Sequence, residues 1–231
     1  MPTVLLVRHG RTAANSSGVL AGRTPGVQLD ETGRVQADAL AARMAAVPLA
    51  AVVSSPLDRC VETAATLVAA RSEPAVTTDD RLIECGYGDW TGRPLRELSR
   101  TKLWKRVQAH PSAAAFPGGE SMRAMQSRAV EAVRDHDASV ADQAGASAVW
   151  VAVSHGDVIK AIVADALGLH LDLFQRIVVD PGSVTVVSFT ELRPFVVRLN
   201  DTGGDLSGLV RRRNRRRRRS DAPVGGGDGT E

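Results

Sequence analysis

Short apolar runs alternate with longer helix-like segments over most of this chain. The runs are rich in Val, Leu and Ala, and most are too short for helices, which suits strands buried in a sheet. We predict strands at residues 4–7, 49–53, 76–78, 148–153, 178–179, 184–189 and 195–199. We predict helices at residues 31–46, 57–70, 95–109, 120–142 and 157–167. This alternation indicates an α/β fold, a three-layer α/β/α sandwich with a mostly parallel central sheet.

Glycine and proline mark the loops between these elements. Residues 11–30 hold three Gly, one Pro and many small polar side chains, and residues 84–92 hold three further Gly. Both segments are therefore predicted to be loops, and the Phe-Pro-Gly-Gly sequence at 116–119 predicts a turn. No internal repeat is visible, so the pattern predicts one folded domain over residues 1–200.

The positive charge of the chain is concentrated at its end. The whole chain carries a net charge of +3 and has a pI near 9.3. Residues 211–231 contain eight Arg and three acidic side chains, a net charge of +5, which leaves −2 for residues 1–210. Few apolar side chains follow residue 201, so we expect a disordered Arg-rich tail over residues 201–231. The basic pI describes this tail, and nucleic-acid binding by the folded domain is not expected.

The N-terminus and the cysteine content indicate a cytoplasmic protein. The first apolar run is four residues long and stops at Arg8, which is too short for a signal peptide. No stretch approaches ~20 consecutive apolar residues, so no membrane association is expected. Cys60 and Cys85 are too few for a disulfide framework, and we interpret both as small buried filler rather than as a redox switch.

Reactive side chains follow three of the predicted strands. These strand ends read Arg8-His9-Gly10, Ser54-Ser55-Pro56 and Ser154-His155-Gly156. Arg59 lies in the first turn of the helix after the second strand, and Glu84 lies in a glycine-containing loop. Ligands of parallel sheets bind outside the carboxyl ends of the strands. We therefore expect one pocket that holds two His, two Arg and one Glu.

These side-chain types suit a phosphate ester. Two guanidinium groups match the oxygens of a phosphate dianion, and a neutral imidazole is a nucleophile able to form a covalent intermediate. A carboxylic acid can protonate the departing oxygen. Helix N-termini after Pro56 and at Gly156 add backbone N–H donors. Because the cationic side chains neutralise the phosphate, no metal or other cofactor is expected.

Four sequence blocks resemble the histidine phosphatase superfamily, the phosphoglycerate mutase-like proteins. The blocks are Leu6-Val7-Arg8-His9-Gly10-Arg11-Thr12 with Asn15 following, Ser54–Ala64, Glu84–Gly92 and Val153–Gly156. They occur in the family's order, and the resemblance covers about residues 3–190. One Arg-His-Gly tripeptide would be weak evidence, but four ordered blocks are a specific signal. The resemblance implies a phosphoglycerate mutase-like fold.

The resemblance also implies a role for each central residue of the pocket. His9 would be the nucleophile that becomes phosphorylated. Arg8, Arg59 and His155 would bind the phosphoryl group. Glu84 would donate the proton to the leaving group and later act as the base. The implied reaction is hydrolysis of a small phosphorylated substrate through a phosphohistidine.

Two further residues are expected to line the pocket. Asn15 can donate an amide hydrogen to a phosphate oxygen, and Gly22 allows close approach of the backbone. Glu84 has two nearby rivals for the role of acid, Asp80 and Asp89.

A metal site is the alternative interpretation of the same cluster. His9, His155 and Glu84 are all metal-ligating residue types. Two arginines in the same pocket would repel a divalent cation, so we favour the phosphate site.

Two other functions share features with this hypothesis. A phosphoglycerate mutase would return the phosphoryl group to another hydroxyl, but mutases of this family carry a longer insert between the third and fourth blocks than the segment from Cys85 to Ser154. A protein that binds phosphate or nucleic acid without turnover would not need both His9 and Glu84. The physiological substrate and the oligomeric state, a homo-oligomer included, stay open.

A basic segment follows the third block and has two interpretations. Its cations are Arg93, Arg96, Arg100, Lys102, Lys105 and Arg106. They would either line the mouth of the pocket and attract an anionic substrate or form the solvated face of a helix.

We predict that deletion of residues 211–231 leaves folding and chemistry nearly unchanged, because the segment has too few apolar side chains to stabilise the domain. Any electrostatic help to an anionic substrate should vanish near 1 M salt, where the Debye length is ~3 Å. The measurement is kcat/KM of full-length and truncated protein at low and high salt. Loss of activity at every salt concentration would show that the tail packs on the domain.

Overall fold

Six strands form one sheet at the centre of the computed structural model, which describes residues 2–204. The strands are β1 (Thr3–Arg8), β2 (Ala51–Ser54), β3 (Val76–Thr78), β4 (Val149–Ser154), β5 (Val184–Ser188) and β6 (Phe195–Asp201). Their order across the sheet is β3-β2-β4-β1-β5-β6. The first four are parallel, whereas β5 is antiparallel to β1 and β6 is antiparallel to β5. The predicted mostly parallel sheet is confirmed.

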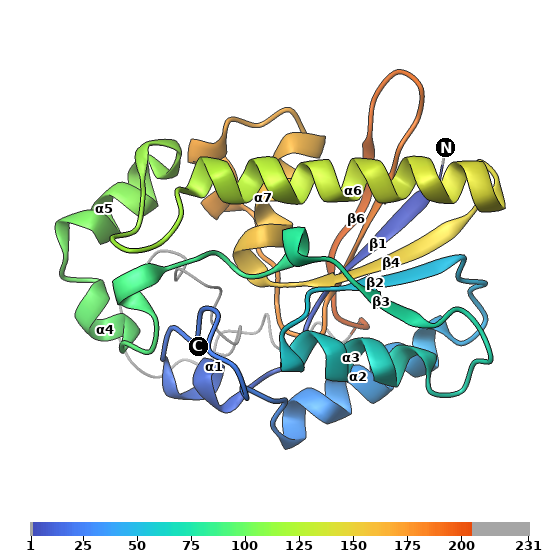
Figure 1. Cartoon of the computed structure of the whole chain (residues 1–231), viewed down its shortest axis with the longest axis horizontal. Coiled ribbons are helices and arrows are strands. Elements are labelled where there is room, and N and C mark those ends of the chain that lie inside the picture. Colours follow the sequence, from blue (N-terminus) through green and yellow to red (C-terminus); the bar gives the residue numbers. More distant parts are fainter. Residues whose placement is uncertain (1, 205–231) are drawn as a thin grey trace.

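Helices cover both faces of this sheet (Figure 1). The α-helices of the described residues are α1 (Ala13–Ser17), α2 (Glu31–Met44), α3 (Asp58–Val68), α4 (Leu95–Leu98), α5 (Lys102–Ala109), α6 (Met122–Ala144) and α7 (Gly156–Ala166). Short 3₁₀ helices are η1 (Asp80–Leu82), η2 (Gly88–Trp90), η3 (Pro111–Ala113) and η4 (Leu171–Arg176). Helices α6 and α7 pack on one face, and α2 and α3 pack on the other. The three predicted layers are confirmed.

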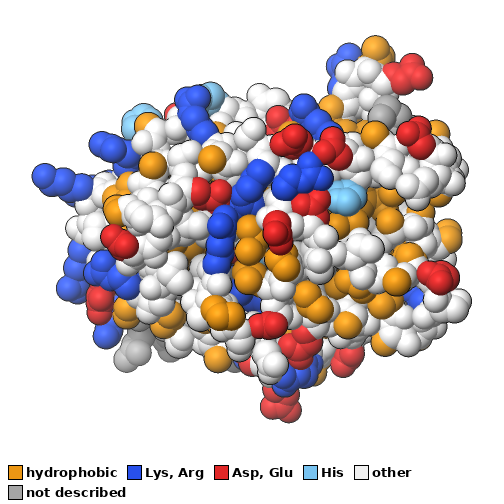
Figure 2. Space-filling view, in the orientation of Figure 1, with side chains coloured by type: hydrophobic (Ala, Val, Ile, Leu, Met, Phe, Trp, Pro, Cys, Tyr) orange, Lys and Arg blue, Asp and Glu red, His pale blue; other side chains and the backbone are white. Residues whose placement is uncertain are grey.

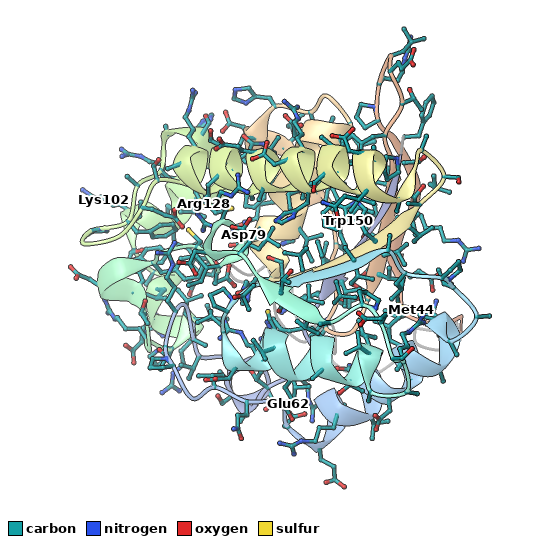
Figure 3. All side chains as sticks on the ribbon, turned by 45° about the vertical axis from the view of Figure 1, so that its right-hand side comes forward. Met44, Glu62, Asp79, Lys102, Arg128 and Trp150 are labelled. Atoms are coloured by element: carbon teal, nitrogen blue, oxygen red, sulfur yellow. The ribbon has the colours of Figure 1, made fainter. Side chains whose placement is uncertain are left out.

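The apolar character of the central strands follows from this two-sided cover. Successive side chains of a strand point to opposite faces, so a strand covered on both sides is apolar throughout. In β4, Trp150 and Ala152 join the core under α6 and α7, whereas Val151 and Val153 join the core under α2 and α3. The Trp150 indole also donates to Oδ1 of Asp137 on α6 at 3.0 Å, and Figure 3 shows this side chain beneath the long helix.

Two helical predictions needed correction. Residues 11–30 were predicted to be loop, but Thr12 and Asn15 form a reciprocal capping box that begins the short helix α1. Residues 95–109 were predicted to be one helix, but they form two helices, α4 and α5. The second one starts anew because the Thr101 side chain accepts from the Trp104 backbone N–H at 3.1 Å and caps it.

The end of the fold also differs from the prediction. Residues 178–179 are not a strand, since Val178 is exposed and the Val179 carbonyl accepts from a side chain near the site. β6 is an edge strand whose Phe195, Val197 and Leu199 are exposed, so it lacks the two-sided cover of the central strands. Asp201, predicted to open the tail, ends β6 and accepts from Arg43 at 2.6 Å.

Most of the predicted tail is not covered by the structure. The segment at 205–231, which is most of the predicted tail, lies outside the described residues. Within the described residues, no helix has the length and apolar content needed to cross a membrane.

Candidate active site

Three neighbouring parallel strands end side by side and bring the predicted residues together. Arg8 at the end of β1 pairs with Ser154 at the end of β4, and Ser54 at the end of β2 pairs with Val153. The residues that follow, His9 and His155, therefore leave the sheet at the same edge. Their rings lie 5.3 Å apart between centroids, edge to face.

Nε2 is the unprotonated nitrogen of the His9 ring. Its Nδ1 lies 2.7 Å from the Gly10 carbonyl oxygen, which only accepts, so Nδ1 carries the proton. Nε2 accepts from Nε of Arg59 at 3.3 Å. Burial, followed by the charges of Arg59 and Arg8, holds the pKa of His9 well below its usual value. His9 is therefore a neutral imidazole at physiological pH.

His155 is fully buried between the Arg59 guanidinium and the Ser55 hydroxyl. A guanidinium only donates, so Nδ1 of His155 accepts from Nη2 of Arg59 at 3.2 Å, and Nε2–H donates to Oγ of Ser55 at 2.8 Å. Burial and the charge of Arg59 hold the pKa of His155 well below its usual value. To donate to a phosphate oxygen through Nδ1, this ring must first gain a proton, which a bound dianion favours.

Arg8 and Arg59 are the two cations of the cluster, and both are buried. Nη1 of Arg8 donates to the Val179 carbonyl at 2.7 Å, and Nη2 of Arg59 donates to the Gly22 carbonyl at 2.8 Å. Nη1 of Arg59 is buried without a hydrogen-bond partner in the described part of the chain. Such a donor is costly unless a ligand satisfies it, and a phosphate oxygen would do so.

Glu84 is the buried carboxyl group of the cluster. Its Oε1 accepts from the Cys85 backbone N–H at 2.9 Å, and its Oε2 lies 3.9 Å from Nδ1 of His155. Burial, together with the charge of Asp157, raises the pKa of Glu84 to about 7. The predicted rivals Asp80 and Asp89 are exposed, and Glu84 is the carboxyl group that the fold brings beside the histidines.

Gly22, Gly156 and Asn15, the other residues predicted at the site, have different surroundings. Gly22 has a φ of +54°, and an added Cβ would lie 2.8 Å from Oγ1 of Thr91, so the position favours glycine. Gly156 is buried and begins α7 without a side-chain cap, directly after His155. Asn15 accepts from the Thr12 backbone N–H and hydroxyl through Oδ1, at 3.0 and 2.9 Å.

Asn15 therefore holds α1 in place. Among the described residues it makes no hydrogen bond to Arg8, His9, Arg59 or His155. A hydrogen bond from its amide N–H₂ group to a phosphate oxygen stays a prediction.

A group of residues missed in the sequence holds the backbone of Glu84. Arg23 and Arg128 both donate to its carbonyl oxygen, at 2.8 and 3.2 Å. Both arginines also pair with Glu120, which accepts the Gly86 backbone N–H at 2.7 Å. Figure 3 shows Arg128 on α6, on the side that faces the loops. No local sequence motif predicts this network, because its members are far apart in the chain.

A second missed group consists of Tyr87, Asp157 and Lys160, all buried. The Tyr87 hydroxyl donates to Oδ2 of Asp157 at 2.8 Å, and Nζ of Lys160 lies 3.9 Å from Oδ1 of Asp157. The sequence did carry a signal here, because Asp157 and Lys160 are charged residues within the otherwise apolar or glycine stretch from Gly156 to Ala164 of α7.

The remaining predicted features lie around the cluster. Burial raises the pKa of Cys60 to about 12 and that of Cys85 well above its usual value, as expected of buried filler. The described residues contain no group of three His, Cys, Asp or Glu side chains placed to hold a metal ion. The six cations at 93–106 are exposed, and blue side chains gather over α4 and α5 in Figure 2.

Two buried arginines, two buried histidines and a buried carboxyl group thus lie together at one sheet edge, a combination that suits a phosphate ester. The sequence profile of the histidine phosphatase superfamily (branch 1) matches residues 4–202. The chain therefore belongs to the histidine phosphatase superfamily.

Curated relatives and solved structures carry phosphatase names. Phosphoserine phosphatase 1 of Hydrogenobacter thermophilus is 29% identical over 87% of this chain and 93% of its own length. Glucosyl-3-phosphoglycerate phosphatase of Mycolicibacterium vanbaalenii is 33% identical over 73% of this chain and 76% of its own length. The solved mycobacterial glucosyl-3-phosphoglycerate phosphatase in complex with VO3 has a TM-score of 0.76 and 28% identity, covering 86% of this chain and 98% of that one. This protein is accordingly a phosphatase of that superfamily.

Proposed function

We propose that this phosphatase hydrolyses small phosphate monoesters through a phosphohistidine at Nε2 of His9, without a metal ion. The observation that carries the proposal is the tautomer of His9. Its Nδ1–H is held by the Gly10 carbonyl, so the lone pair of Nε2 faces the guanidinium of Arg59. A phosphoryl group bound by that guanidinium is then within reach of a neutral nucleophile.

In the first step, Nε2 of His9 forms a bond to phosphorus as the bond from phosphorus to the ester oxygen breaks. Glu84 gives its proton to that oxygen, so the leaving group departs as a neutral alcohol. Arg8 and Arg59 neutralise the charge on the other phosphoryl oxygens. The protonated form of Glu84 is available near neutral pH because burial raises the pKa of this carboxyl group to about 7.

In the second step, water attacks the phosphorus atom of the phosphohistidine. The Glu84 carboxylate takes a proton from that water, and the bond between Nε2 and phosphorus breaks. Inorganic phosphate leaves, and the neutral imidazole and the protonated carboxyl group are restored. One carboxyl group thus serves as acid and then as base.

The nature of the acceptor separates hydrolysis from mutase activity. The relatives named phosphoserine phosphatase and glucosyl-3-phosphoglycerate phosphatase cover most of this chain and support hydrolysis, in which water is the acceptor. We propose a phosphorylated small molecule as the substrate, and the compounds named in the relatives, phosphoserine and glucosyl-3-phosphoglycerate, are the first esters to test. The two free cysteines support a reducing compartment, and we propose the cytoplasm.

We predict that His9→Ala lowers kcat/KM for an aryl phosphate by several orders of magnitude, because the covalent route is lost. The measurement is release of free phosphate, with circular dichroism to confirm the fold. The matched control is His110→Ala, an exposed histidine whose loss should leave turnover unchanged. Activity of a folded His9→Ala variant within about tenfold of the wild type would contradict the role of His9.

We predict that Glu84→Gln damages esters of alcohols far more than nitrophenyl phosphate. An alkoxide needs a proton as it leaves, whereas a nitrophenolate hardly does, and general acids contribute about 10²–10⁴-fold. The measurement is kcat/KM of wild type and variant on both kinds of ester. Equal losses on the two esters would mean that the acid is another residue.

We predict that dialysis against a strong chelator leaves the rate unchanged, because the buried cations Arg8 and Arg59 would neutralise the phosphate without a metal ion. The measurement is phosphate release before and after dialysis, with added divalent ions as the control. A large loss that one added metal restores would contradict metal independence.

A further inference from the structure

Two charged side chains lie buried on α7, where the other residues from Gly156 to Ala164 are apolar or glycine. Asp157 is fully buried, and Lys160 is 3% exposed. Burial of a charged group is costly unless the group is paired, so such residues in an apolar helix require a reason. The proposed mechanism, in which neither of them touches the phosphate, does not supply one.

The surroundings of this pair lead to Glu84. The Tyr87 hydroxyl, three residues after Glu84, donates to Oδ2 of Asp157 at 2.8 Å. His155, two residues before Asp157, places Nδ1 3.9 Å from Oε2 of Glu84. Lys160 lies 3.9 Å from Oδ1 of Asp157 and donates to Oε1 of Gln175 at 3.2 Å. Asp157 is thus linked through Tyr87 to the loop that carries Glu84, and it lies two residues after the imidazole beside Glu84.

We propose that Asp157 and Lys160 are positioning residues that act in opposite directions on the proton held by Glu84. The Asp157 carboxylate makes a second negative charge nearby unfavourable, and Lys160 moderates that effect. This inference rests on the proposed function, in which Glu84 is the proton donor.

The charges around Glu84 come from every element that packs on it. They are Arg8 from β1, Arg59 from α3, His155 after β4, Asp157 and Lys160 from α7, Cys85 and Tyr87 from its own loop, and Arg23 and Arg128 on its backbone carbonyl. The two buried arginines favour the ionised carboxylate, and burial opposes it. Asp157 is the charge that opposes the arginines most strongly, and it raises the pKa of Glu84.

Lys160 has the reverse influence. Burial lowers the pKa of Lys160, while the negative charges of Asp157 and Glu84 raise it, so the ammonium group and the Glu84 carboxylate stabilise each other. Removal of the cation therefore destabilises ionised Glu84, and removal of Asp157 stabilises it. The two substitutions have opposite signs, which a purely structural role would not produce.

The test is the pH dependence of kcat/KM for an alkyl phosphate. Its fall at high pH reports loss of the acid's proton in the free enzyme. Asp157→Asn removes the negative charge while the amide oxygen still accepts from Tyr87, and we expect the fall to move to lower pH. Lys160→Met removes the positive charge at similar volume, and we expect the fall to move to higher pH. Each shift should be on the order of one pH unit.

Three controls keep the outcomes separate. Asp165→Asn changes a more exposed carboxylate farther along α7 that pairs with Arg134, and it should leave the profile unchanged. Nitrophenyl phosphate, which hardly needs the acid, should show kcat/KM within a few-fold of wild type in both test variants. Lys160→Gln replaces Lys160→Met if the latter does not fold.

The outcomes decide as follows. A fall at lower pH in Asp157→Asn together with a fall at higher pH in Lys160→Met supports the proposal. Any other combination, including no shift in one or both variants, overturns it. If the wild-type profile has no fall at high pH, or Glu84→Gln retains the same fall, the role of Glu84 in the proposed function has failed. That failure is visible before either α7 variant is measured.

Discussion

Two buried guanidinium groups at the edge of a parallel sheet are the constraint on which the site depends. Arg8 and Arg59 lie at the ends of neighbouring elements, and both are nearly inaccessible to solvent. Buried cations are tolerated when anions or carbonyls surround them, and one donor of Arg59 has no partner in the described structure. The fold therefore holds a place in which a dianion completes the hydrogen bonding.

The same burial sets the protonation of the reacting groups. It lowers the pKa of His9 and raises that of Glu84 to about 7, which favours a neutral imidazole and a protonated carboxyl group. The arginines lower the pKa of His9 further and counteract the rise in the pKa of Glu84. Asp157 raises the pKa of Glu84 against the arginines, and we propose that a carboxylate is buried there for this reason. Opposite pKa shifts in one buried pocket would let the proposed nucleophile and the proposed acid work at the same pH.

The sequence predicted the parts of this site that lie directly at strand ends. Arg8, His9 and His155 each follow a buried apolar run, and parallel pairing brings such residues together whatever the details of the loops. Glu84 was predicted less firmly, because its burial depends on Arg23 and Arg128, which come from distant segments. Long-range pairing of that kind leaves no local pattern.

Errors in the fold have similar local causes. Helix α1 was missed because one capping box outweighs the loop-like composition of residues 11–30. The exposure of β6 could not be predicted, because an edge strand with apolar residues has the same sequence pattern as a covered one. The three layers and the strand order at the site were not sensitive to these errors, since they rest on the strongly apolar runs at β1, β2 and β4.

The covalent intermediate is the most direct test of the account. The measurement is rapid acid-free quenching during turnover of a phosphate ester, followed by mass spectrometry of the peptide that contains His9 and by phosphorus NMR of the intact protein. The account predicts phosphate on Nε2 of His9 that forms within the first turnover and decays as phosphate is released. Turnover without any phosphorylated protein, or with the phosphate on His155, would contradict it.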